Sequence, residues 1–197
     1  MWFNDTYIGD ASTVKELDLS GQLLELLEVL ACTVSLPFPP SPDAAMVKVT
    51  DDTAFSSQPT VKQMVGLRPF GFVSVINLRV ACERGVEPTE ADECTKNGVS
   101  YFSCSVPCVL DDATDEDVMD VVAAVERALR AHHSAPKPVL IHCDSGKRSC
   151  AVVLVYAARA MRADFKQVLR WGLDLGHDLS DLRWLSHSLL LDVDDAR

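Results

Sequence analysis

Residues 137–149 read Lys-Pro-Val-Leu-Ile-His-Cys-Asp-Ser-Gly-Lys-Arg-Ser, and the interpretation of the whole chain starts from them. Their first part, the apolar run 139–141, is typical of a short buried strand. A polar loop that contains Gly146 follows, and after it comes a long apolar helical segment, 151–161. The stretch therefore predicts a strand, a tight loop and a helix, with Cys143 directly after the strand.

The loop has the residues that covalent catalysis needs. Backbone N–H groups and the dipole of a helix N-terminus favour a thiolate at Cys143 and any oxyanion bound beside it. Gly146 lets the backbone curl so that successive N–H groups point inward as an anion-binding nest. Arg148, on the first turn of the helix, adds a planar fork of donors that suits a tetrahedral oxyanion. We interpret the loop as a covalent-catalysis site with Cys143 as nucleophile.

Each of these three residues also has a purely structural interpretation. Cys143 could be a buried core thiol, Gly146 a simple turn glycine and Arg148 a surface charge. A core position would not be followed by six residues as polar as Asp-Ser-Gly-Lys-Arg-Ser. Reactive thiols lie in electropositive, partly exposed surroundings, and the sequence around Cys143 predicts such surroundings.

The other loop residues have supporting roles in this interpretation. Ser149 either donates its hydroxyl to the sulfur, which makes the sulfur a better leaving group, or caps the helix. We expect His142 to order the loop by hydrogen bonding rather than to shuttle protons. Lys147 is expected to be solvated and to add positive potential. Asp144 and Ser145 complete the predicted anion-binding loop.

The composition limits the possible partners. The chain has 197 residues, 48% of them hydrophobic, and a formal net charge of −11, which disfavours nucleic acid and anionic membranes as partners. We find no stretch of about 18 apolar residues and no secretory signal. Seven cysteines, an odd number, occur without C-x-x-C or zinc-site spacing. We therefore expect a reducing, cytoplasmic compartment, free thiols, and neither metal nor cofactor.

Two parts of the chain are expected, 1–45 and 46–197. Ser12 or Thr13 can cap a helix that runs to about Cys32 and carries a leucine stripe. Residues 36–42 contain four prolines and predict a stiff linker. The helix can dock on the second part, form a dimer or act as a detachable arm, and the oligomeric state stays open.

The second part alternates strands with helices. Strands are expected at 46–50, 73–78, 99–105 and 139–141. Helices are expected at 60–67, 88–96, from 114 to about 130 after Asp111-Asp112-Ala113, at 151–161, about 164–171 and about 180–190. This alternation predicts an α/β fold with a mostly parallel sheet and helices on both faces. Ligands bind at the carboxyl ends of strands in such sheets, which is where Cys143 is placed.

Three spaced segments resemble one known family. They are Ser57-Gln58-Pro59, then Gly-Phe-Val-Ser-Val-Ile-Asn-Leu-Arg at 71–79, and Pro-Val-Leu-Ile-His-Cys-Asp-Ser-Gly-Lys-Arg-Ser at 138–149. The third resembles the phosphate-binding loop of cysteine-dependent phosphatases. Together the segments resemble the phosphatase-like domain of beta-lactamase hydrolase-like proteins, over about residues 46–190. The resemblance implies a dual-specificity-phosphatase-like fold, Cys143 as nucleophile, Arg148 as phosphate clamp and a general acid on an upstream loop.

Asp111 and Asp112 are the candidates for that acid. They lie 32 and 31 residues before Cys143, the spacing that this class of phosphatase uses. Protonation of the leaving oxygen contributes about 10²–10⁴-fold, and we prefer Asp112 slightly. Alternatively, both charges only complement the dipole of the helix that follows. Arg79, which follows strand 73–78, either lines the pocket or pairs with Glu83 on the surface.

One departure from the phosphatase pattern leaves a second function open. The usual loop is C-x5-R, whereas Cys143 and Arg148 form C-x4-R. Rhodanese-like sulfurtransferases use the shorter loop to carry a persulfide, although the resembled family also has it. We predict hydrolysis of a phosphate monoester of unidentified type through a phosphocysteine. The alternatives are persulfide sulfur transfer, a non-catalytic anion-binding module and a thiol-based arsenate reductase.

Overall fold

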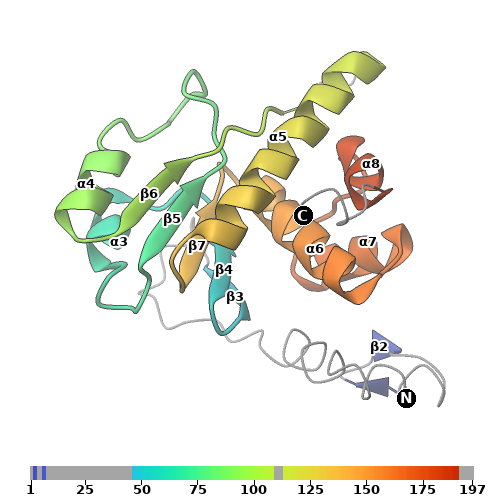
Figure 1. Cartoon of the computed structure of the whole chain (residues 1–197), viewed down its shortest axis with the longest axis horizontal. Helices are drawn as coiled ribbons and strands as arrows, with labels where there is room; N and C mark the ends of the chain where they lie inside the picture. The colour runs from blue at the N-terminus through green and yellow to red at the C-terminus, as the bar shows by residue number, and fades with distance from the viewer. Residues whose placement is uncertain (1, 4–5, 8–45, 109–112, 191–197) are drawn as a thin grey trace.

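The computed structural model describes residues 2–3, 6–7, 46–108 and 113–190 (Figure 1). Two short strands near the N-terminus, β1 (Trp2–Phe3) and β2 (Thr6–Tyr7), pair antiparallel. The expected helix from Ser12 or Thr13, the proline linker and the boundary near residue 45 lie outside the described residues.

A five-stranded sheet forms the centre of the described part. Its strands are β3 (Val47–Thr50), β4 (Thr53–Ser56), β5 (Ser74–Asn77), β6 (Ser100–Ser103) and β7 (Val139–His142). Their order is β3-β4-β7-β5-β6, and only the β3–β4 pair in this sheet is antiparallel. The predicted α/β fold with a mostly parallel sheet is confirmed.

The register aligns the strand ends that carry the site. Ser56 at the end of β4 and Asn77 at the end of β5 both pair with His142, the last residue of β7. Because the three strands are parallel, their carboxyl ends meet at one edge of the sheet, and the loop that begins at Cys143 leaves from the middle of that edge.

Strand β4 was not expected from the sequence. Its residues Thr-Ala-Phe-Ser contain a single large apolar side chain, so they lack the apolar run or alternation that marks strands elsewhere in the chain. All four residues are buried, and the strand pairs with β3 on one side and β7 on the other. Its conformation is therefore set by the two neighbouring strands rather than by its own pattern.

Six helices of the described part accompany the sheet. They are α3 (Val61–Gly66), α4 (Glu90–Lys96), α5 (Asp115–Ser134), α6 (Lys147–Met161), α7 (Phe165–Asp174) and α8 (Trp184–Leu190). Capping boxes fix the starts of α3 and α5, where Thr60 pairs with Gln63 and Thr114 with Asp117. All six correspond to expected helices, with ends that differ by a few residues.

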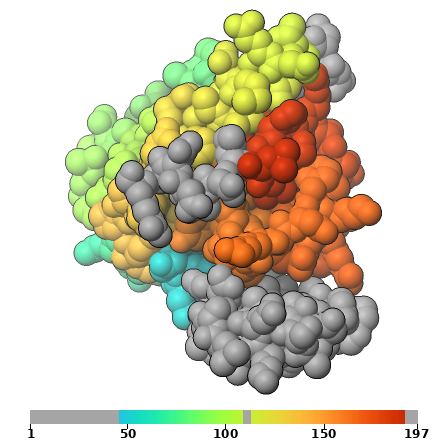
Figure 2. Space-filling model, turned by 45° about the vertical axis from the view of Figure 1, so that its right-hand side comes forward, coloured from blue at the N-terminus to red at the C-terminus, as the bar shows by residue number. Residues whose placement is uncertain are grey.

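The core consists of two clusters that share the sheet. Val139 and Ile141 of β7 belong to the larger cluster, which includes buried residues of α5, α6, α7 and α8. Leu140, between them, belongs to the smaller cluster with Leu67 and Cys94, from the end of α3 and from α4. Figure 1 shows α3 and α4 near β6 at the left, and α6, α7 and α8 together at the right. At the molecular surface α8 lies beside α5 (Figure 2).

Candidate active site

The turn after β7 depends on Gly146. Gly146 is the N-cap of α6 and has φ = +93°, a left-handed conformation that L side chains rarely adopt. In this conformation its backbone N–H donates to Sγ of Cys143 across 3.2 Å. A backbone donor of the helix start is thus directed at the sulfur, as the sequence had suggested for an anion-binding loop.

Cys143 is less accessible than expected. Its relative exposure is 0%, so the predicted partial exposure of the thiol is wrong. Sγ lies 3.6 Å from Oγ of Ser149, which itself lies 2.9 Å from the carbonyl oxygens of Ser56 and Gly146. The sulfur is therefore at the floor of the loop, where a backbone N–H and a hydroxyl face it.

Arg148 reaches the site with its guanidinium fixed by two loops. Nη1 and Nη2 donate to the two carboxylate oxygens of Glu83 at 2.7 Å each, and Nη1 also donates to the carbonyl of Val106 at 2.7 Å. Burial alone lowers the pKa of Arg148, but the hydrogen bonds that it donates to Glu83 outweigh this effect and raise the pKa. No contact with a described residue uses Nε, so this N–H stays available to a bound oxyanion.

Arg79 is part of the same framework and is not on the surface. It is 2% exposed, which corrects the expectation of a surface pair with Glu83, although Nε does contact Glu83 at 3.3 Å. Nη1 donates to Oε1 of Gln58 at 2.8 Å, and Nη2 lies 3.3 Å from Oδ1 of Asp144. Arg79 therefore ties the loop after β4 to the catalytic loop, and any contact with substrate stays a prediction.

A buried polar network behind the loop was missed by sequence reasoning. Nε2 of His142 forms an ion-pair contact with Oε1 of Glu90, and both side chains are buried. Oε2 of Glu90 accepts from Asn77 at 3.1 Å and from Gln58 at 3.3 Å. Nδ1 of His142 lies 3.5 Å from the carbonyl of Cys143. The sequence showed Glu90 only as one acid among several at the start of a helix.

Three other predicted loop residues lie on the outside of the turn. Lys147 pairs with Asp181 at 2.5 Å and is less solvated than expected. Asp144 and Ser145 are exposed, and the carbonyl of Asp144 accepts from the backbone N–H of Gln58 at 2.9 Å.

The two candidate acids, Asp111 and Asp112, lie outside the described residues. The residues around them can be located. The carbonyl of Val106 contacts Arg148, and the carbonyl of Ala113 accepts from Arg183 at 2.6 Å. The segment that leads to Asp111 therefore starts next to the guanidinium of the site.

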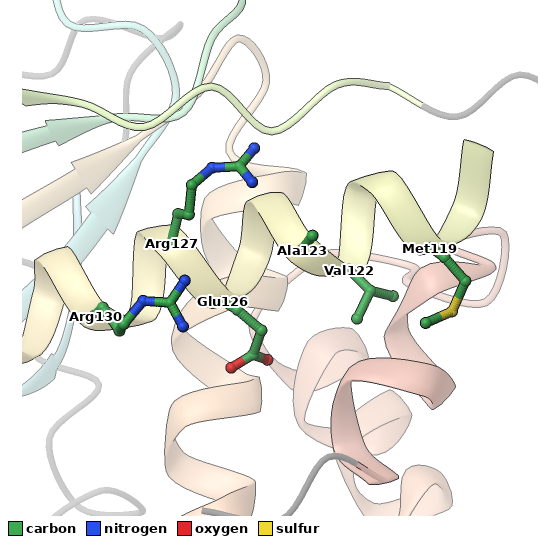
Figure 3. A pocket seen from close by; sticks show the side chains of 6 residues that line it. All are labelled: Met119, Val122, Ala123, Glu126, Arg127 and Arg130. Carbon is green, nitrogen blue, oxygen red and sulfur yellow. The ribbon is translucent and has the colours of Figure 1, made fainter. Parts of the chain in front are cut away.

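A separate hollow of about 370 Å³ runs along α5 and does not include the loop. Its lining residues are Met119, Val122, Ala123, Glu126, Arg127 and Arg130 (Figure 3). Among the described residues no group of three or more His, Cys, Asp and Glu side chains is placed to hold a metal ion. In the same part of the chain, no helix has the length and hydropathy to cross a membrane.

Solved structures identify the fold. A proposed phosphatase (DUF442) from Shewanella putrefaciens CN-32 is 23% identical, with a TM-score of 0.52 over 73% of this chain and 87% of that one. A proposed phosphatase from Neisseria meningitidis Z2491 is 20% identical, with a TM-score of 0.53 over 72% and 96%. This chain has the cysteine-dependent phosphatase fold.

A third similar structure shares this phosphatase fold. A variant of TpbA from P. aeruginosa, in complex with phosphotyrosine, is 17% identical, with a TM-score of 0.50 over 79% of this chain and 93% of that one. No family model and no curated protein matches the chain. The three structures confirm the fold that the sequence motifs implied, and the roles of individual residues rest on the geometry above.

Proposed function

We propose that this protein is a cysteine-dependent phosphatase that hydrolyses phosphate monoesters through a phosphocysteine intermediate. The observation that carries the proposal is the backbone N–H of Gly146, directed at Sγ of Cys143 at the start of the helix that carries Arg148, whose guanidinium Glu83 holds in place. This arrangement stabilises negative charge first on the sulfur and then on the transferring phosphoryl group. The two core clusters also support the expectation that helices cover both sheet faces.

In the first step, the thiolate of Cys143 attacks phosphorus in line with the ester oxygen. An S–P bond forms and the P–O bond to the leaving group breaks, while loop amides and Nε of Arg148 stabilise the equatorial oxygens. Asp111 or Asp112 gives its proton to the leaving oxygen. The resemblance and the spacing support this role, with Asp112 preferred.

In the second step, water attacks the phosphocysteine. The new P–O bond replaces the S–P bond, the electron pair returns to sulfur and the same aspartate takes the water proton. Ser149 assists because its hydroxyl, 3.6 Å from Sγ, can donate to the departing sulfur. The products are inorganic phosphate and the free thiolate.

The substrate we propose is a phosphorylated molecule, with neither nucleic acid nor a membrane as partner. The net charge of −11 is unfavourable for both. The phosphotyrosine bound to the TpbA variant makes an aryl phosphate the first substrate class to test. The related structures give no support to sulfur transfer, which the short loop had suggested.

A paired assay on one preparation tests the proposal. Hydrolysis of an aryl phosphate is compared with sulfur transfer from thiosulfate to cyanide, using wild type, Cys143→Ser and the exposed-cysteine control Cys82→Ser. We expect phosphate release that Cys143→Ser abolishes and Cys82→Ser leaves unchanged. Sulfur transfer without phosphate release would assign the loop to a sulfurtransferase. Binding of phosphate with neither activity would assign it to an anion-binding module.

A further inference from the structure

His177, in the loop between α7 and α8, lies against the catalytic loop. A methyl group placed on Cα of Gly146 would lie 3.1 Å from Cε1 and 3.3 Å from Nε2 of His177. The imidazole therefore lies next to the residue whose amide faces Sγ of Cys143. The sequence gives no local signal for His177, because the contact joins segments about 30 residues apart along the chain.

The loop that carries His177 is held rigidly. The backbone N–H of His177 donates to the carbonyl of Gly172 at 2.8 Å. A methyl group on Gly172 would lie 2.7 Å from two side-chain carbons of Leu179, so α7 and the loop approach as closely as glycine permits. The ion pair between Lys147 and Asp181 joins the same loop to the start of α6. The position of His177 beside the site is thus fixed by packing from several sides.

The imidazole is free to bind a ligand. Its ring packs edge-on against Phe55, with centroids 5.7 Å apart, and forms no hydrogen bond with a described residue. Burial, and to a smaller extent the charge of Lys147, lowers the pKa of His177, which favours the neutral form of the ring. A neutral imidazole offers one N–H donor and one acceptor nitrogen. It can therefore donate to an oxyanion without a second positive charge beside Arg148.

We propose that His177 contacts the substrate, donating its ring N–H to an oxygen of the phosphate monoester bound in the loop 143–148. The inference rests on the proposed function and adds a binding residue from a separate element. A single hydrogen bond of this kind to a charged acceptor changes affinity by about 10- to 150-fold. His177 would thus strengthen phosphate binding in a loop that is one residue shorter than usual.

The test compares His177→Ala, His177→Asn and His187→Ala in the full chain. His187 is exposed on α8 and serves as the matched control. Inorganic phosphate is titrated into each protein, and the amide signal of Gly146 is followed by NMR, which requires no turnover. Hydrolysis of an aryl phosphate is measured on the same samples, and melting temperatures verify folding.

We expect His177→Ala to weaken phosphate binding about 10- to 150-fold, while His177→Asn, whose amide can donate, loses clearly less. His187→Ala should match wild type. Unchanged phosphate affinity in a folded His177→Ala protein, or an equal loss in both His177 variants, overturns the inference and leaves the proposed function standing. A wild-type protein that neither binds nor releases phosphate overturns the proposed function, and this inference with it.

Discussion

The guanidinium of Arg148 and the carboxylate of Glu83 form two parallel hydrogen bonds of 2.7 Å each. Glu83 belongs to the loop between β5 and α4, so the pair joins this loop to the first turn of α6. Such bidentate contacts between a guanidinium and a carboxylate fix the orientation of the guanidinium and also stabilise its charge. Because Glu83 binds both terminal nitrogens, it fixes the orientation of the whole guanidinium of Arg148.

Replacement of Glu83 by alanine is therefore expected to damage the site without touching the nucleophile. Arg148, only 5% exposed, would keep its charge but lose its partner, and Arg79 would lose one of its contacts. We expect kcat/KM for an aryl phosphate to fall about 10- to 100-fold, because a misplaced guanidinium stabilises the transition state poorly. Glu87→Ala, in the same loop and with a carboxylate that accepts from Thr89, is the control. Equal rates in the two variants would show that Glu83 does not position Arg148.

The same pair predicts a pH dependence of stability. Burial alone raises the pKa of Glu83, but hydrogen bonds from Arg148, the Val80 amide and Arg79 outweigh it and lower the pKa to about 2. A lowered carboxylate pKa gives stability that is complete above the unfolded-state pKa and is lost as pH falls toward 2. Because Glu83 is partly exposed, we expect a loss of only about 1 kcal/mol.

Chemical unfolding of wild type and Glu83→Gln, measured between pH 5.5 and about 2.5, checks this. The difference in unfolding free energy between the two proteins should shrink as the solution becomes more acidic. A difference that stays constant over this range would mean that the charge of Glu83 does not contribute.

The fold was predictable where apolar residues cluster locally, and β4 shows where this fails. Residues 139–141 are Val-Leu-Ile and indicate a strand by themselves, whereas 53–56 are Thr-Ala-Phe-Ser. The second segment becomes a strand because β3 and β7 supply hydrogen bonds on both sides. Pairing between segments more than 80 residues apart depends on the whole sheet and has no local sequence signal.

The candidate site also has a part with a local sequence signal and a part without one. The loop from His142 to Ser149 is contiguous, and its glycine, arginine and thiol together indicated an anion-binding turn. Its partners Glu83, Glu90 and His177 come from three separate elements, and each looked like an ordinary surface residue in the sequence. Only the tertiary structure shows which acidic side chain pairs with which basic one. In a chain with 29 acidic residues, each arginine, lysine or histidine has many possible partners in the sequence.

Comparison of Gly146→Ala with Gly98→Ala separates the cost of backbone strain from the effect of crowding at the candidate site. At φ = +93° an alanine costs about 1–2 kcal/mol, and its methyl group would also press on His177 at 3.1 Å. Gly98, at φ = +70° with no atom near the position of a Cβ, gives a control with strain alone. We expect both variants to lower the melting temperature, and only Gly146→Ala to reduce kcat by 10-fold or more, since the N–H facing Cys143 shifts. Full activity in Gly146→Ala would remove this amide from the mechanism.

A second pH dependence of stability is expected from His132. This residue lies at the edge of the sheet opposite the candidate site, so the effect concerns the fold and not catalysis. Its Nε2 lies 3.0 Å from Oγ1 of Thr53 and 2.8 Å from Nζ of Lys137. Burial, and then the charge of Lys137, lowers the pKa of His132 to about 4. The unfolded chain then binds the proton more readily, so stability falls as pH drops from about 6.5 to 4, by up to about 3 kcal/mol.

Unfolding free energies of His132→Gln, with exposed His133→Gln as control, test this effect. We expect a flatter pH profile between about pH 6.5 and 4 only in His132→Gln. A profile as steep as that of wild type would assign the proton uptake to other groups.

Glu90→Gln tests whether the buried network positions the catalytic loop. Glu90 contacts His142 with one oxygen and accepts from Asn77 and Gln58 with the other. A glutamine has no charge and only one acceptor oxygen, so it loses the ion-pair contact with His142 and cannot keep every hydrogen bond of the network. We expect a loss of about 1–3 kcal/mol in stability. Because His142 precedes Cys143 directly, kcat should fall about 10-fold while KM changes less. Glu93→Gln, whose carboxylate pairs with the largely exposed Lys96 on the same helix, should change neither by a measurable amount. A Glu90→Gln protein that is destabilised but keeps the wild-type kcat would show that the network only supports the fold. A loss of both stability and kcat would show that Glu90, on α4, also positions the catalytic loop.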